Sequence, residues 1–245
     1  MKQSLLPALI CMLMLSCAQQ GKHEKTAAVS PDTTAGQSLS AGKENEDTEI
    51  IETFTDSTRI GEKGQCKIEL IKHRVLDHTY VIVKYYTRGP RLWHHQHTYL
   101  YECDAIMDFH PELADFNHDT LNDLTFVSAT AARGANEVRR LFIYDKDERQ
   151  LVPIVNAQDF PNLRYNKQLD CIDAFLVHGT ATTVFANIIG DSLKAFAFVY
   201  NGMDFHTVAI VDQNGNEKEI SKVKGKGPYT RFRNFRPLEV LDAAE

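Results

Sequence analysis

The chain has 245 residues, with 27 Lys or Arg against 33 Asp or Glu, and a formal net charge of -6 at pH 7. An acidic balance argues against nucleic-acid binding, which uses basic surfaces. The length is sufficient for one domain with a sizeable core. The five cysteines lack the CxxC or Cys/His spacing of a zinc site.

The first residues have the pattern of an export signal. Met1-Lys2 precedes an apolar run from Leu5 to Leu15 that is too short to span a bilayer. Residues 14–17, Met-Leu-Ser-Cys, resemble a bacterial lipobox, which implies cleavage after residue 16 and lipid attachment to Cys17. We therefore expect a lipoprotein anchored to a membrane of the bacterial cell envelope, at the periplasmic face or the cell surface. The alternatives are a secretory peptide cut elsewhere and a short membrane anchor.

Residues 17–48 predict a disordered tether. They are rich in Gln, Lys, Ser, Thr, Gly and Glu and hold few large apolar residues, so they cannot bury enough surface to fold. A flexible chain of this length spans about 30 Å. The tether would let a folded domain stand off the membrane.

Residues 49–245 predict a single all-β domain, because short runs of alternating or β-branched residues are separated by turn signals every 8 to 12 residues. We expect an antiparallel meander, either propeller-like or a sandwich. Turns are expected at Gly179, Gly190-Asp191, Asn201-Gly202 and Asn214-Gly215, and Asn-Gly favours two-residue hairpin turns. The expected strands are residues 66–71, 78–86, 97–101, 124–127, 138–144, 151–152, 172–178, 182–189, 193–200, 205–211 and 218–223.

Three cysteines lie within this domain, at Cys66, Cys103 and Cys171. In an oxidising envelope, one disulfide and one free thiol are expected. Three residues leave the pairing open.

Oxygen-bearing side chains alternate along residues 115–123. Calcium prefers several oxygen ligands, and a loop with side-chain oxygens at positions 1, 3, 5 and 9 and a backbone carbonyl at position 7 can surround one ion. Position 12, a Glu in EF-hands, is Phe126, so this is not an EF-hand. The expected ligands are Asp115, Asn117, Asp119, the Leu121 carbonyl and Asp123.

Position 6 of this loop makes the sharp turn, for which glycine is preferred, but the chain has Thr120 there. A β-branched residue is strained in a left-handed conformation, so we expect modest calcium affinity. The alternative is a polar Asx-type turn that holds no metal.

Residues 113–124 resemble the calcium loop of FG-GAP and related integrin-type propeller repeats, present here in one copy. With the small-residue loop at 131–136 and the strand Leu-Phe-Ile-Tyr-Asp at 141–145, the chain is similar to a smaller family. These are Gram-negative envelope proteins with a propeller-like β fold, some of which inhibit lysozymes and other peptidoglycan hydrolases. The similarity covers about residues 105 to 200.

The resemblance implies a structural calcium ion in the 115–123 loop and a protein partner, a peptidoglycan hydrolase. The contact surface would be the loop at 131–136, where Arg133 would meet the catalytic carboxylates of a glycan-cleaving enzyme. The implied partner-binding residues are Arg133, Gly134, Ala135 and Asn136. The alternatives are a plain surface loop and an FG-GAP-type module that binds a glycan or protein without inhibition. We expect no enzymatic activity, because GxSxG, HExxH and phosphate-loop motifs are missing from the sequence.

Two further segments carry weaker signals. If residues 93–97 form a regular strand, His95 and His97 share a face and could chelate a metal; the alternative is a polar loop around Trp93. Residues 218–236 are rich in Lys and Arg, which suits an anionic surface or, equally, a solvated edge, and Phe232 and Phe235 indicate that this region packs on the domain.

Overall fold

The computed structural model describes residues 48–225 and 227–241. The predicted signal peptide, the lipidation site Cys17 and nearly all of the predicted tether lie outside these residues. No helix long and apolar enough to cross a membrane occurs in the described part of the chain.

Strands dominate the described residues, which contain two short 3-10 turns and no α-helix. All strand pairs within the sheets are antiparallel, and the strands of the three main sheets follow one another as meanders. The predicted all-β fold of antiparallel meanders is therefore confirmed.

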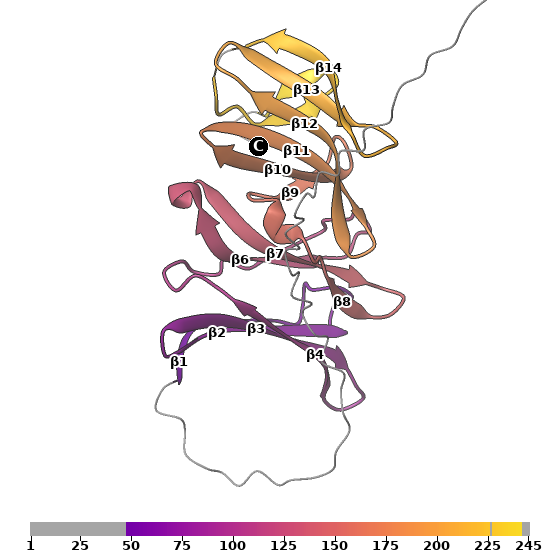
Figure 1. Cartoon of the computed structure of the whole chain (residues 1–245). Coiled ribbons are helices and arrows are strands. Elements are labelled where there is room, and N and C mark those ends of the chain that lie inside the picture. Colours follow the sequence, from indigo (N-terminus) through magenta and orange to yellow (C-terminus); the bar gives the residue numbers. More distant parts are fainter. Residues whose placement is uncertain (1–47, 226, 242–245) are drawn as a thin grey trace, which may run out of the picture. The chain divides into compact units, whose positions relative to one another are not determined.

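Three sheets follow one another along the chain (Figure 1). The first contains β1 (Thr48–Asp56), β2 (Cys66–Val75), β3 (His78–Arg88) and β4 (Trp93–Glu102). The second contains β5 (Glu112–Ala114), β6 (Asp123–Ala131), β7 (Asn136–Asp145) and β8 (Gln150–Pro153), with the 3-10 turn η1 (Ala132–Gly134) between β6 and β7. The third follows the 3-10 turn η2 (Ala157–Asp159) and contains β9 (Arg164–Asn166), β10 (Cys171–His178), β11 (Thr180–Ile189), β12 (Ser192–Asn201), β13 (Phe205–Val211) and β14 (Glu217–Lys224). A last hairpin pairs β15 (Phe232–Phe235) with β16 (Leu238–Val240).

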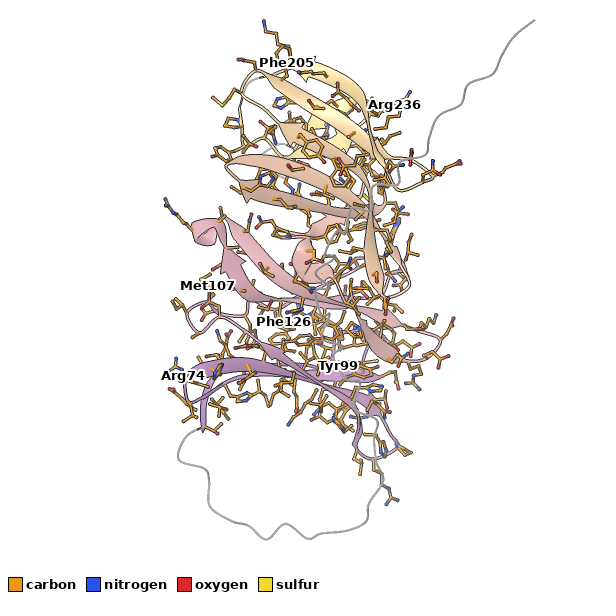
Figure 2. All side chains as sticks on the ribbon, viewed as in Figure 1. Arg74, Tyr99, Met107, Phe126, Phe205 and Arg236 are labelled. Atoms are coloured by element: carbon orange, nitrogen blue, oxygen red, sulfur yellow. The ribbon has the colours of Figure 1, made fainter. Side chains whose placement is uncertain are left out.

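Alternating burial explains how the sheets pack. In β2, Cys66, Ile68 and Leu70 are buried whereas the residues between them are partly exposed. These side chains join residues of the second sheet in one core, with Phe126 of β6 fully buried and Tyr99 of β4 packed against that core (Figure 2). A second core joins the second and third sheets, and a third core joins the third sheet to the last hairpin.

All the strands that the sequence predicts are present, but two turns differ from the prediction. Asn201 is the last residue of β12 and its side chain is buried, so a three-residue loop joins β12 to β13. The hairpin at Asn214-Gly215 spans residues 212–216, and only Gly215 has a positive φ, of 82°. The hairpins are therefore confirmed, whereas the two-residue turns are wrong at both Asn-Gly positions.

The cysteine expectation also differs from the structure. Cys66, Cys103 and Cys171 are all free thiols, and the first and third are buried. Cys66 belongs to the core between the first two sheets, whereas Cys171 belongs to the core beneath the last hairpin. Each buried thiol fills space as a small apolar group in its own core.

The C-terminal region packs on the domain, as its aromatic residues predict. Phe232 is 1% exposed and Phe235 lies against the third core. Lys218, Lys222 and Lys224 lie on the exposed edge strand β14, where positive charge discourages pairing with another chain.

Asparagine side chains link neighbouring sheets where strand pairing stops. Asn136 accepts the backbone N–H of Val177 at 2.9 Å and donates to its carbonyl at 3.0 Å. Asn156 forms the same pair of bonds with Leu193, at 2.8 and 2.9 Å. Each amide thus takes the place of a paired strand residue and satisfies both backbone groups of its partner.

We predict that Asn156→Ala lowers the free energy of unfolding by about 1–3 kcal/mol, because it leaves the N–H and carbonyl of Leu193 without their partner. Urea unfolding monitored by circular dichroism measures the change. Asn214→Ala, in an exposed hairpin turn, is the matched control and should change stability by less than about 0.5 kcal/mol. Equal effects of the two substitutions would contradict the role of the Asn156 side chain.

Candidate functional site

The strand β6 connects the two features that the sequence singles out. Asp123, its first residue, closes the predicted calcium loop, and Ala131, its last residue, leads into the small-residue loop. Nine extended residues separate these features by roughly 25–30 Å. Both are therefore parts of one hairpin, β6–β7, but lie at opposite ends of it.

The predicted calcium loop curls around its own acceptor oxygens. Asp115 accepts the backbone N–H groups of Asp119 and Thr120, at 3.2 and 2.8 Å. Asp119 accepts the N–H of Leu121 at 2.8 Å, and Asn117 accepts the N–H of Asp119 at 3.3 Å. The alternating side chains are thus gathered toward the inside of a single turn. These bonds also suit an Asx-type turn.

Thr120 adopts the left-handed conformation that position 6 requires, with φ of 74°. The residue two positions before it, His118, is also left-handed, with φ of 61°. A β-branched residue at positive φ is a strained exception. Thr120 therefore occupies a turn position whose backbone conformation favours glycine.

Asp123 is more deeply placed than the other predicted ligands. Its side chain is fully buried, and its two oxygens accept the backbone N–H groups of Phe116 and Tyr144, both at 2.8 Å. Burial raises the pKa of Asp123 to about 7, and the nearby carboxylates of Asp119 and Asp115 raise it further, against the lowering effect of those two hydrogen bonds. The loop therefore concentrates negative charge beside a buried carboxyl.

These residues fit a divalent cation in charge and in donor type. Three carboxylates, one amide oxygen and the Leu121 carbonyl would supply oxygen ligands, and each oxygen of Asp123 keeps a lone pair besides the one that accepts an N–H. No group of three or more His, Cys, Asp or Glu placed to hold a metal occurs among residues 48–225 and 227–241. A cation bound by the predicted ligands would therefore need the amide oxygen of Asn117 and the carbonyl of Leu121 as well as the carboxylates.

A second link ties the loop to the connection between β1 and β2 of the first sheet. The carbonyl of Asn122 accepts the N–H of Gly61 at 2.9 Å, and its side chain donates to the carbonyl of Arg59 at 3.0 Å. A side chain at Gly61 would lie 2.8 Å from the ring of Tyr144, so only glycine allows this approach. The first sheet and β7 thus both hold the end of the loop.

The loop at the other end of β6 is a strained, exposed tip. Ala132, Arg133 and Gly134 have φ of 51°, 59° and 89°, three left-handed residues in succession. All residues from Ala131 to Ala135 are exposed. Left-handed backbone costs roughly 1–2 kcal/mol for each non-glycine residue, so the surrounding structure must hold it in place.

The base of this tip is bonded to the third sheet. Asn162 donates from its side chain to the carbonyl of Ala135 at 2.9 Å and to that of Phe175 at 2.8 Å, and it accepts the N–H of Glu137 at 3.1 Å. Asn136 is bonded to Val177 as described above. Of the four predicted partner-binding residues, Arg133, Gly134 and Ala135 are thus exposed at the tip, whereas the Asn136 side chain anchors it.

The histidine-rich segment does not form the predicted shared face. A bulge in the β3–β4 pairing places His97 opposite Tyr85 and His95 opposite Tyr86, so the two histidines lie on opposite faces of the sheet. The shared histidine face is therefore wrong, and so is the alternative of a polar loop, because Trp93–Glu102 form strand β4. The sequence offers no signal for this bulge.

Trp93 lies at the start of β4, beside cations of the first sheet. The Arg88 guanidinium lies 4.9 Å from the Trp93 ring centre, and the Lys67 ammonium lies 4.1 Å from that of Tyr86. Lys67 also donates to Glu69 at 2.7 Å. These contacts assign the two rings to cation–π packing on the first sheet.

No protein-family model matches this chain, and no curated protein matches it. Among solved structures, the chain is similar to one described as "Structure of a Xanthomonas Type IV Secretion System related protein", with 11% sequence identity and a TM-score of 0.40. The match covers 74% of this chain and 96% of that one. A likeness this distant carries no inference about function.

We predict that Thr120→Gly raises the free energy of unfolding by up to about 1 kcal/mol, because glycine adopts a φ of 74° without the clash of a Cβ atom. Thermal melts in the presence of calcium measure the gain. Thr120→Ala is the control: it keeps the Cβ atom and should gain less. A Thr120→Gly protein no more stable than the Thr120→Ala protein would show that the turn is not strained by the side chain.

Proposed function

We propose that this chain is a lipid-anchored protein of the bacterial cell envelope that holds calcium as a structural ion and binds and inhibits a peptidoglycan hydrolase of the lysozyme type. The observation that carries the proposal is the exposed tip of the β6–β7 hairpin. There, Arg133 is held in a left-handed conformation between small residues. Backbone strain at an exposed position is typical of sites where a binding geometry is set in advance.

The shape of the tip suits insertion into a substrate cleft. Residues 131, 132, 134 and 135 are Ala or Gly, so Arg133 is the one long side chain between Thr130 and Asn136. The Arg133 side chain forms no ion pair with another described residue. Its planar guanidinium is matched to a carboxylate, and glycan-cleaving enzymes carry two carboxyls across the scissile bond.

Rigidity is what separates an inhibitory loop from an ordinary one. A loop that is ordered only on binding loses conformational entropy, and pre-organisation removes that cost. The bonds of Asn136 and Asn162 to the third sheet make the tip of the hairpin rigid. A calcium ion bound at Asp123 would make the opposite end of the hairpin rigid, without contact with the partner.

The calcium assignment is tested by melting the protein in calcium and in EGTA. A ligand that binds only the folded state adds about 2.7 kcal/mol of stability at one hundred times its dissociation constant. We expect calcium to raise the melting temperature, and Asp119→Ala to abolish the rise. Asp77→Ala, an exposed acid in the turn between β2 and β3, should keep it. An identical melting temperature in calcium and EGTA would leave the loop as a polar turn without metal.

The inhibitor assignment is tested by titrating the protein against a panel of lysozyme-type and other peptidoglycan hydrolases, with turbidity of cell-wall suspensions as the readout. We expect at least one enzyme to be inhibited, and Arg133→Glu to weaken that inhibition about 30-fold or more, since loss of a buried charge partner costs 2 kcal/mol or more. Lys63→Glu, a charge reversal at an exposed lysine before β2, should have little effect. If the entire panel is unaffected, or if both substitutions act equally, the proposed inhibition is wrong.

A further inference from the structure

A cavity of about 450 Å³ opens beside the short edge strand β9, and its lining includes none of the residues assigned to calcium or to the β6–β7 tip. The strand, the turn after it and the last hairpin all contribute to its wall. The lining residues used below are Arg164, Lys167, Gln168, Asp173 and Arg233. Three of these five carry positive charge.

One buried carboxylate holds two guanidinium groups at this place. Asp173 is 1% exposed. Arg231 donates from Nε to its Oδ1 at 2.7 Å and adds a second bond from a terminal nitrogen, while the Nε of Arg164 lies 3.5 Å from its Oδ2. One negative charge thus faces two positive charges, and Asp173 acts as a positioning residue for both.

Arg164 keeps the terminal part of its fork available. Its side chain is about one-third exposed, and its closest approach to Asp173 is through Nε, at 3.5 Å. Among the described residues, its two terminal nitrogens form no hydrogen bond or ion pair that uses them, so they are donors without acceptors. An arginine held at Nε with both terminal nitrogens open is arranged to bind a planar or tetrahedral oxyanion in two-point fashion.

The acid that contacts two of the lining residues, Gln168 and Arg233, is already engaged. Glu239 accepts from Arg233 at 3.2 Å and from Gln168 at 3.0 Å, which lowers the pKa of this carboxyl below its ordinary value. Lys167 is exposed and forms no ion pair with a described residue. Arg164 and Lys167 therefore leave a net positive charge facing the cavity of a protein whose full chain carries a net charge of -6.

We propose that this cavity is a binding site for an oxyanion, the carboxylate or phosphate group of a small molecule or polymer, with Arg164 as the two-point contact and Lys167 as the second cation. Pre-positioning by Asp173 means that Arg164 needs little reordering to bind. The proposal does not rest on the calcium assignment or on the partner enzyme, although Arg164 and Lys167 also line a neighbouring pocket with Asp115 of the predicted calcium loop. It assigns a second binding function to the cavity beside β9.

Isothermal titration of the full chain with sodium phosphate, sodium acetate and sodium chloride at constant ionic strength tests the site. We expect saturable one-to-one binding of phosphate, acetate or both, and none of chloride; the two oxyanion titrations distinguish a phosphate site from a carboxylate site. Arg164→Gln and Lys167→Gln should each weaken binding about tenfold or more, whereas Lys63→Gln should leave it unchanged. Lys167 is exposed, so its substitution should not alter the melting temperature.

Arg164→Lys separates loss of the fork from loss of charge or fold. It keeps the positive charge beside Asp173 but not the paired donors, so we expect weakened oxyanion binding at an unchanged melting temperature. The proposal is overturned if the protein binds neither oxyanion at 10 mM, a concentration that detects dissociation constants of about 10 mM or tighter. It is also overturned if Arg164→Gln and Lys167→Gln bind as tightly as the unmodified chain, because the ion would then lie elsewhere.

Discussion

The buried carboxylate of Asp123 is the interaction on which the centre of this protein depends. It ends the 115–122 loop, begins β6 and accepts backbone N–H groups from Phe116 before it and Tyr144 on the neighbouring strand β7. A buried charged group is stable only where hydrogen bonds or a counter-charge compensate for the loss of water. The same carboxylate therefore closes the loop, fixes the start of the hairpin and supplies a negative group that a cation would neutralise.

The two ends of the hairpin that begins at Asp123 differ in how they are packed. The end at Asp123 is compact, because Asn122 bonds to the connection between β1 and β2, and Tyr144 packs against Gly61. The opposite end, the tip, is exposed from Ala131 to Ala135. Asparagines resolve this difference: Asn136 and Asn162 bond to the third sheet just below the tip, so the exposed residues begin where the anchoring ends. Rigidity of the tip thus comes from side chains in positions where strand pairing is impossible.

Much of the fold could be predicted from the sequence because alternation and turn residues act locally. The strands from Cys66 to Val223 follow from period-two burial, as in Cys66, Ile68 and Leu70. The short strands β5, β9, β15 and β16 could not be predicted, since three or four residues are too few to show a period; β8 is equally short, and the turn at 145–148 before it was its signal. β1 could not be predicted either, because its first four residues are all exposed on an edge strand and show no alternation.

The candidate sites could likewise be predicted only in part from the sequence. The spacing of Asp115, Asn117 and Asp119 identified a loop whose side chains bond to its own backbone, whereas calcium binding there stays a prediction. The small residues around Arg133 identified the exposed tip. The bulge that separates His95 from His97 had no local signal, because it is an irregularity of pairing with β3. The cavity at Arg164 was equally invisible, since it depends on Asp173 and Arg231, which are 58 residues apart in the sequence.

The meander order of the three sheets has a consequence for how the chain becomes folded. Within each sheet every strand pairs with the strand next to it in sequence, so the loops to be closed are short. Short loops lose little entropy on closure, and proteins rich in local contacts fold faster than those with distant pairings. Each sheet can therefore complete its hydrogen bonds as soon as its own residues are available, in order from β1 to β14. A chain that crosses a membrane from its N-terminus would then emerge one finished sheet at a time, with few unpaired strand edges waiting for distant partners.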